Sequence, residues 1–480
     1  MGLSSEPTNL DPVIQGGTSQ RAVKGAIYRG LFNYCKGGEI CPELAESYEI
    51  SDDGLTYTFK LREAVFHNGD PVTAEDVKFS LERIMDPESG ASFSHYFSVV
   101  DSVDVVDENT VSVVLNQVTA PFLGYLSLAE SAIVSKAWTE EHDGSLAEFP
   151  MGAGPFEFVE YLSGQHILVK KFDDFYKDGY PKADEIYFEF FGDGNTRVIA
   201  LQSGDVDLIE YVPWKDKATL VADDGVQILG GTGPFMALVF NANHEAFSDP
   251  LVRQAVGYAI DRQVVIDTAF SGEGIPLYGM NIPSNSIAYD PQFDNYFTYD
   301  PEKAKELLAE AGYPDGFKAT LLSTSQYDMH QNTAIAVQSE LQKIGIETEL
   351  DLPDWATRLE QNLAADYDYL VVGTAGDITD PDFLADYYEN ASGEIRYNNS
   401  PGFVDERIDE LLVLGRSTVD PAERKAYYQE LQQRALDLSP LVYLMWRDQS
   451  YAASNDVQGF EPLPGFLSFQ SGYMLEEAYK

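Results

Sequence analysis

Helix-starting signals alternate with short apolar segments along most of this chain. Asp-Pro pairs stand at Asp249-Pro250, Asp300-Pro301 and Asp420-Pro421, where an aspartate side chain can cap a helix and proline fits its first turn. Between such starts lie segments of strand length, at 57–61, 111–115, 167–171, 185–191, 236–241, 319–322, 347–352, 369–374 and 441–445. The alternation predicts α/β domains with mixed sheets flanked by helices, rather than a bundle or a solenoid.

The length of 480 residues exceeds what one hydrophobic core supports, so we expect two or three domains. Segments rich in Gly, Pro and Asp fall near 143–155, 222–234 and 273–295, and we interpret them as loops, the first two as candidate domain boundaries. The longest apolar runs, such as 236–240, have strand length and fall short of the roughly 20 residues that span a bilayer. Because no low-complexity linker separates the domains, the chain is expected to pass between them more than once.

Acidic residues outnumber basic residues, 79 to 31, which gives a formal net charge of −48. Such a surface repels phosphate backbones and anionic lipid headgroups, which argues against nucleic-acid and membrane-surface binding. The acids are spread along the chain, as in a solvated acidic shell suited to a saline or wall-rich exterior. A preference for a cationic ligand is the second interpretation.

The two cysteines, Cys35 and Cys41, flank a turn between two extended segments. They are candidates for a disulfide across a hairpin. The alternative is a pair of inert core residues, because spacing alone does not supply disulfide geometry.

Catalytic and metal-binding motifs are missing from the sequence. The glycines at 152 and 154 lack the lysine of a phosphate-binding loop, and His244-Glu245 is not followed by a second histidine at zinc-site spacing. The run Asp377, Asp380, Asp382 lacks the central glycine and terminal glutamate of a calcium loop. We therefore expect a protein that is not an enzyme and that needs no cofactor or metal.

A series of short motifs runs through nearly the whole chain in one order. The series contains Asn9-Leu10-Asp11-Pro12, Tyr28-Arg29-Gly30-Leu31-Phe32, Pro42-Glu43-Leu44-Ala45-Glu46-Ser47, Phe66-His67-Asn68-Gly69, Gly152-Ala153-Gly154-Pro155-Phe156 and Tyr299-Asp300-Pro301-Glu302-Lys303-Ala304. In this order the motifs resemble solute-binding protein family 5, which holds the binding proteins of peptide, nickel and related ABC importers.

The resemblance implies a two-lobe clamp like that of periplasmic binding proteins, in the class with an extra subdomain. Lobe I is then 1–42, 150–236 and 457–480, its extra subdomain is 43–149, and lobe II is 237–456. It also implies an extracytoplasmic monomer that works with a membrane permease. The start at Met1-Gly2 has no export signal, which fits either a cytoplasmic protein or a mature chain. The resemblance favours the mature chain, with a lipid anchor in the native precursor.

The resemblance also implies where a ligand binds. Peptide-binding members anchor the α-ammonium of the peptide on an aspartate, and the matching stretch here ends at Asp377, with Thr374 and Gly376 before it. An ammonium in a water-poor site needs a carboxylate, because a lone buried charge is costly. Asp377 is therefore the predicted anchor, with an ordinary loop acid as the alternative.

Further site residues follow from the same resemblance. Trp355 falls where oligopeptide receptors carry a pocket-wall tryptophan, with a core tryptophan as the alternative. His330 lies near a histidine that faces the peptide carboxylate in some receptors, and Gln15 lies near the N-terminal ligand-contacting loop. Phe235 and Met236 end the segment 232–236, which together with 371–375 is predicted to bind an extended peptide by strand addition.

The chain departs from the family pattern at three positions. Thr374 replaces the tryptophan usual three residues before the anchoring aspartate, and Asn362 and Val371 stand near the positions of basic residues that meet a peptide's carboxyl end. A free dipeptide needs both termini neutralised, so we expect longer peptides. A nickel chelate, an oligosaccharide or an amine is the alternative within the family, and outside it a cell-wall hydrolase or a chaperone-like protein.

Overall fold

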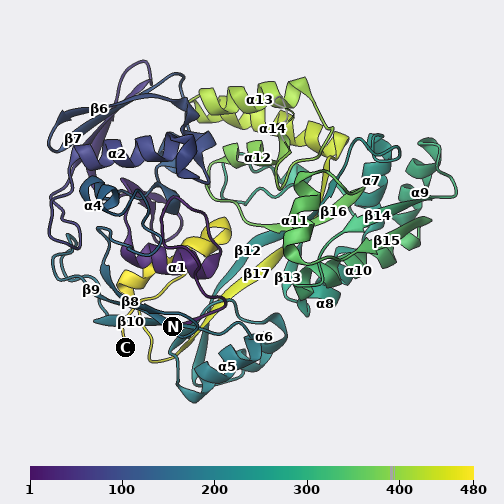
Figure 1. Ribbon diagram of the computed structural model, residues 1–480. Coiled ribbons are helices and arrows are strands. Elements are labelled where there is room, and N and C mark those ends of the chain that lie inside the picture. The colour runs from purple at the N-terminus through teal and green to yellow at the C-terminus, as the bar shows by residue number, and fades with distance from the viewer. Residues whose placement is uncertain (390–392, 394) are drawn as a thin grey trace. The chain divides into compact units, whose positions relative to one another are not determined.

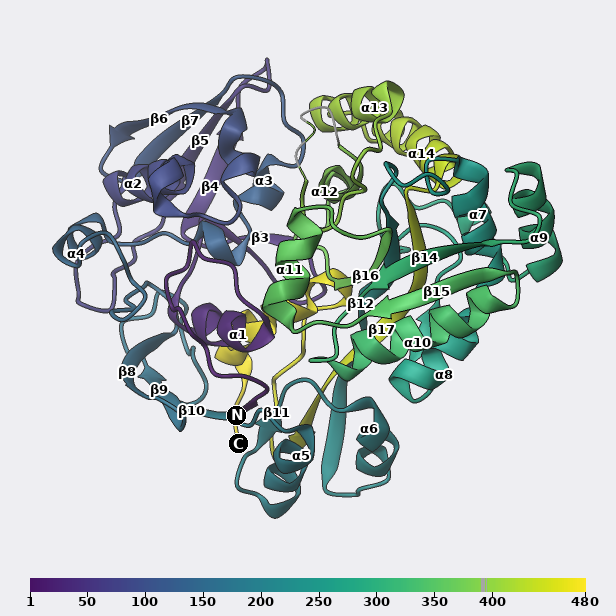
Figure 2. The same cartoon turned by 45° about the vertical axis from the view of Figure 1, so that its right-hand side comes forward.

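The computed structural model describes residues 1–389, 393 and 395–480, shown in two views (Figure 1; Figure 2). The chain forms two compact units, each made of separate stretches of sequence. Unit 1 consists of Met1–Gly231, Asp377–Thr379 and Gln449–Lys480, and unit 2 consists of Thr232–Gly376 and Asp380–Asp448. The mixed sheets flanked by helices confirm the predicted α/β fold class. The separate subdomain at 43–149 stays a prediction.

Unit 1 contains the helices and strands of the N-terminal half of the chain and the C-terminal segment. Its helices are α1 (Thr18–Ile27), α2 (Ala74–Met85), α3 (Phe122–Tyr125), α4 (Lys136–Glu141), α5 (Gly194–Ser203), α6 (Trp214–Val221) and the C-terminal 3-10 segment η6 (Gly465–Glu477). Its strands are β1 (Gly2–Leu3), β2 (Phe32–Tyr34), β3 (Ile40–Pro42), β4 (Ala45–Ile50), β5 (Thr56–Leu61), β6 (Val100–Asp107), β7 (Thr110–Leu115), β8 (Phe156–Leu162), β9 (His166–Lys171), β10 (Glu185–Phe190) and β11 (Leu208–Ile209).

Helix α1 forms the centre of unit 1. All ten of its residues are buried, Arg21 and Lys24 included, and it lies against η6 (Figure 1). A Cβ added at Gly25 would lie 2.8 Å from the backbone of Gly472, so these glycines let the two segments approach closely. The packing of α1 fixes the position of its two buried cations.

Unit 2 contains helices α7 (Pro250–Ala259), α8 (Arg262–Phe270), α9 (Pro301–Glu310), α10 (Asp328–Gln342), α11 (Trp355–Leu363), α12 (Ala385–Tyr388), α13 (Glu406–Ser417) and α14 (Pro421–Leu438). Its strands are β13 (Gly274–Pro276), β14 (Phe317–Leu322), β15 (Ile346–Asp351) and β16 (Tyr369–Thr374). The long strands β12 (Val226–Phe240) and β17 (Leu441–Ser454) begin in one unit and end in the other.

The sheets place β16 next to the predicted ligand residues. In unit 2 the strand order is β15-β14-β16-β12-β17, with β13 paired to β17. In unit 1 the order β17-β11-β1-β10-β9-β8 continues from β17, and β4-β5-β7-β6 and β2-β3 form separate sheets. Helix α10 packs on β15 and on α8 (Figure 2). Within unit 2, β16 is therefore an interior strand that ends at Thr374.

The Asp-Pro signals predicted three helix starts correctly. Asp249, Asp300 and Asp420 each cap their helix, their side chains accepting hydrogen bonds from first-turn amides of α7, α9 and α14. The predicted loop at 222–234 is wrong from Val226 onward, because β12 begins there. Within this strand Gly230 has φ +91°, and a Cβ added there would lie 3.0 Å from the carbonyl oxygen of Gln449. Glycine therefore allows a local irregularity in the long strand.

Cys35 and Cys41 are joined by a disulfide, with their Cα atoms 5.9 Å apart across the β2–β3 hairpin. Among the residues described here, no helix combines the length and the apolar character needed to cross a bilayer. The unit boundaries at 231/232 and 448/449 differ from the predicted lobe boundaries at 236/237 and 456/457, and no unit boundary falls in 143–155.

Candidate ligand-binding site

The end of β16 brings several predicted residues together in unit 2. Phe235 and Met236 pair with Thr374 and Gly373 in an antiparallel ladder, and both side chains are fully buried. A Cβ added at Gly373 would lie 2.8 Å from Sδ of Met236 and 3.3 Å from the ring of His330. The segments 232–236 and 371–375 thus pair with one another in part, which leaves fewer backbone groups for the predicted strand addition.

A cluster of aromatic rings surrounds an arginine beside this strand. The ring centroid of Trp355 lies 5.3 Å from that of Tyr327, 5.7 Å from His330 and 6.3 Å from Tyr397. The guanidinium carbon of Arg358 lies 5.0 Å from the centroid of Trp355 and 4.8 Å from that of Tyr397. Trp355 and Arg358 lie on one face of α11 because residues three apart are neighbours on a helix surface, and Asp354 caps the helix by accepting from the amide of Thr357. We call these five residues the Arg358 cluster.

Arg358 itself is completely buried and only partly hydrogen bonded. Its Nη2 donates to the carbonyl oxygen of Val371 at 2.8 Å. Within the described part of the chain, Nε and Nη1 have no hydrogen-bond partner and no carboxylate forms an ion pair with the guanidinium. A buried charge without a counter-ion costs on the order of several kcal/mol. A guanidinium can pair with a carboxylate through two parallel N–H donors.

His330 supplies a neutral group to the same cluster. Burial, together with the nearby charges of Arg358 and Arg447, lowers the pKa of His330 to about 3. The imidazole is therefore uncharged at neutral pH, and its Nδ1 has no hydrogen-bond partner among the described residues. It can donate or accept one hydrogen bond, but it cannot hold a carboxylate by charge.

Asp377, the predicted anchor, lies in unit 1 within an ion cluster. Arg21 donates from Nη2 to Oδ1 of Asp377 at 2.7 Å and from Nε to Oε1 of Glu130 at 3.0 Å. Gln470 donates to the backbone carbonyl of Asp377 at 3.0 Å. Burial raises the pKa of Glu130, while Arg21 opposes that shift. Whether Asp377 contacts a ligand stays a prediction, as it does for Gly376 beside it.

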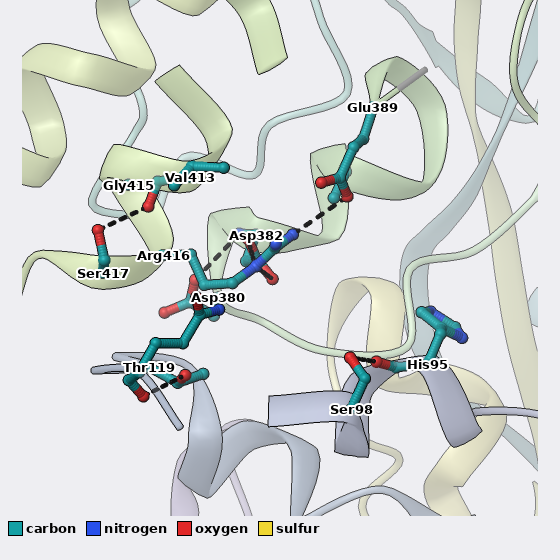
Figure 3. Close-up of polar contacts among 12 residues, drawn as sticks. His95, Ser98, Thr119, Asp380, Asp382, Glu389, Val413, Gly415, Arg416 and Ser417 are labelled. Carbon is teal, nitrogen blue, oxygen red and sulfur yellow. Dashed lines mark hydrogen bonds and ion pairs between the residues drawn. The ribbon is translucent and has the colours of Figure 1, made fainter. Parts of the chain in front are cut away.

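The acids that follow Asp377 are held by arginines of unit 2. Asp380 receives two hydrogen bonds from Arg424, at 2.7 and 3.0 Å. Asp382 is fully buried and pairs with Arg416, which also reaches Glu389 at 3.3 Å (Figure 3). In the described part of the chain no group of three or more His, Cys, Asp or Glu side chains is placed to hold a metal ion. These acids fix the loop after β16 through ion pairs.

The loop before α1 carries Gln15, the remaining predicted residue. Its backbone amide donates to Oγ of Ser92 at 2.8 Å, and its side chain is exposed. Lys24 holds the loop by donating to the carbonyl oxygen of Ile14 at 2.6 Å. A ligand role for Gln15 stays a prediction.

Two arginines were missed by the sequence analysis. The family pattern has basic residues near the positions of Asn362 and Val371. The buried cation of this chain is instead Arg358, one helical turn before Asn362, and it donates to the carbonyl oxygen of Val371. Its spacing from Trp355 on one helix face was the available signal. Arg21 left no such signal, because its partner Asp377 lies 356 residues away.

Comparison with known proteins agrees with this architecture. Residues 39–394 match the family model of bacterial extracellular solute-binding proteins, family 5. The glutathione-binding protein GsiB of Escherichia coli K12 is 29% identical over an alignment that covers 100% of this chain and 93% of that protein. The AgaA structure from A. tumefaciens R10, in complex with agropinic acid, is 52% identical with a TM-score of 0.90 and covers 100% of this chain and 97% of that one.

A peptide receptor is also similar. The DppA structure from Helicobacter pylori, in complex with the peptide STSA, is 26% identical with a TM-score of 0.85 and covers 100% of this chain and 97% of that one. Proteins of this family are extracytoplasmic transport receptors that deliver solutes to ABC importers. The chain belongs to family 5 of the bacterial extracellular solute-binding proteins.

Proposed function

We propose that this protein captures a small solute that carries a carboxylate, of the opine class to which the ligand of AgaA belongs, and delivers it to a membrane permease. The observation that carries the proposal is the buried guanidinium of Arg358, whose Nε and Nη1 lack partners among the described residues. Arginine binds carboxylates through two parallel N–H donors, and desolvation strengthens the pair.

The surroundings of Arg358 support a compact organic acid. Trp355 and Tyr397 flank the guanidinium and offer apolar faces to the carbon skeleton of a solute. Neutral His330 offers one hydrogen bond beside them. AgaA, the relative at 52% identity, was solved with agropinic acid, and this favours an opine over a peptide.

A short or longer peptide is the second candidate. GsiB binds glutathione and DppA was solved with a tetrapeptide, both at lower identity than AgaA. The terminal carboxylate of a peptide would use Arg358 in the same way. Oligopeptide transport belongs to this second candidate. For either ligand we propose a monomer whose precursor carries a lipid anchor.

Calorimetric titration of the purified protein with an acid and with its neutral amide tests the proposal. Agropinic acid and a peptide with a free carboxyl end serve as acids, and the carboxamide of each is the matched ligand. We expect the acid to bind more tightly than its amide, and Arg358→Gln to weaken acid binding at least about thirtyfold. Arg407→Gln, which breaks an exposed ion pair with Glu430, is the control and should bind as the parent does. Equal affinity for acid and amide would overturn the proposal.

A further inference from the structure

Asn362 places a hydrogen-bond acceptor of fixed orientation beside Arg358. It stands one helical turn after Arg358 on α11, so the two side chains lie on the same face of that helix. Asn362 is fully buried, and its Nδ2 donates to the carbonyl oxygen of Tyr397 at 3.0 Å. Because this bond uses the amide nitrogen, the oxygen Oδ1 is left as an acceptor. Within the described residues, Oδ1 has no hydrogen-bond partner.

Arg358 and Asn362 both contact Tyr397. The guanidinium carbon of Arg358 lies 4.8 Å from the centroid of the Tyr397 ring, and Asn362 donates to the backbone of the same residue. Tyr367 adds a buried hydroxyl without a partner in the described part of the chain. Burial raises the pKa of Tyr367, and the charge of Arg358 opposes that shift. Buried polar atoms nearly always have partners in folded proteins, so these donors and acceptors fit a guest that has both an anionic and a donor group.

The charged side chains that act on the rings of this cluster are cations. Arg358 and Arg447 act on His330, and the same two arginines oppose the rise that burial causes in the pKa of Tyr397. An ammonium group next to a carboxylate held by Arg358 would find the neutral amide of Asn362 beside it. Like charges repel strongly where water is scarce. A hydroxyl or an amide N–H at that place carries no charge and can donate to Oδ1.

We infer that Asn362 determines which acids bind at Arg358, because its Oδ1 accepts a hydrogen bond from a neutral N–H or O–H next to the carboxylate and offers no counter-ion to an ammonium. The inference rests on the proposed function and refines the class of solute. N-acylated amino acids, 2-hydroxy acids and the carboxyl ends of peptides belong to that class. Free α-amino acids do not, since their ammonium group is next to the carboxylate.

Calorimetric titration with leucine and two of its derivatives tests the inference. N-acetylleucine carries a neutral N–H next to its carboxylate, leucine carries an ammonium there, and N-acetyl-N-methylleucine carries no donor. The parent protein is expected to bind N-acetylleucine at least about tenfold more tightly than leucine, because leucine brings a second cation to Arg358. It should bind N-acetylleucine about fivefold more tightly than the N-methyl derivative, which leaves Oδ1 of Asn362 without a donor.

Two variants of Asn362 make the result specific. Asn362→Asp puts a carboxylate of the same shape beside Arg358, and the affinity ratio of N-acetylleucine to leucine should move about tenfold toward leucine. A merely structural role of Asn362 would leave that ratio unchanged. Asn362→Leu should abolish the preference for N–H over N-methyl. Asn295→Leu, at an exposed position of unit 2, is the control and should keep both ratios.

The inference and the proposed function fail in different ways. Melting temperatures check that each variant is folded, and if neither variant of Asn362 folds, the two ratios of the parent protein decide. Equal binding of N-acetylleucine and its carboxamide overturns the proposed function and with it the inference. If the acid binds better than its carboxamide, but leucine or the N-methyl derivative binds as tightly as N-acetylleucine, only the inference fails.

Two further outcomes also overturn the role of Asn362. One is an unchanged ratio of N-acetylleucine to leucine in a folded Asn362→Asp variant. The other is a parent protein that binds neither leucine nor either derivative, whereas its binding of agropinic acid more tightly than the carboxamide would still support the proposed function.

Discussion

Single residues in this protein differ most in how their buried charges are neutralised. Arg21 has two carboxylate partners, whereas the guanidinium of Arg358 has a backbone carbonyl and two aromatic rings. The predicted position of Asp377 in the loop after β16 followed from the order of motifs. The pairing of Asp377 with Arg21 could not be predicted from the sequence, because an ion pair between distant segments depends on how α1 packs and not on any local pattern.

His67 makes stability depend on pH at the same scale. Its Nε2 lies 3.0 Å from the Gly154 carbonyl and its Nδ1 accepts from the Gly152 amide, which requires a neutral ring. Burial lowers its pKa from 6.5 to about 4. The unfolded chain therefore takes up a proton at a higher pH than the folded chain, so this residue's stabilising contribution is complete above pH 6.5 and is lost as the pH falls toward 4.

Denaturant unfolding at several pH values measures this effect. His67→Gln should remove roughly 3 kcal/mol of the loss in unfolding free energy between pH 6.5 and 4. His95→Gln, at an exposed position, is the control and should follow the parent curve. Parallel curves for His67→Gln and the parent would contradict the assignment.

Whole elements were predicted where their signal is local. The aspartate caps of α7, α9 and α14 act on amides two or three residues away, so the sequence contains all that is needed. Strands β12 and β17 were predicted too short, at 236–241 and 441–445, because the rest of each contains glycine, proline or polar residues. Gln449 and Ser450 in β17 are buried despite their polarity, and no local pattern in the sequence indicates that.

The cap of α14 gives a prediction at the scale of an element. One carboxylate oxygen of Asp420 accepts from the amides of Ala422 and Glu423, at 3.0 and 2.9 Å. Asp420→Ala should lower the free energy of unfolding by about 1 kcal/mol, because two first-turn amides lose their acceptor. Asp420→Ser retains a capping oxygen and should lose less than half as much in the same chemical denaturation. Equal losses in the two variants would show that the cap is not the cause.

At the scale of the whole molecule, an excess of 48 negative charges opposes compaction. Salt screens this repulsion, with a Debye length of about 10 Å at 0.1 M and about 3 Å at 1 M. The melting temperature should therefore rise between 0.1 and 1 M NaCl, by on the order of several degrees. Sorbitol at equal osmolality is the control for non-ionic effects. A melting temperature that falls with salt would mean that the ion pairs contribute more than the net charge.

Neither unit is a continuous piece of chain. Unit 1 draws on three stretches of sequence and unit 2 on two, and β17, near the C-terminus, contributes residues to both. While the ribosome is still making the first 440 residues, each unit lacks a strand of its sheet, so neither can finish folding during synthesis. This delay suits a polypeptide that must leave the cytoplasm, because a chain that has not finished folding can still pass through an export channel.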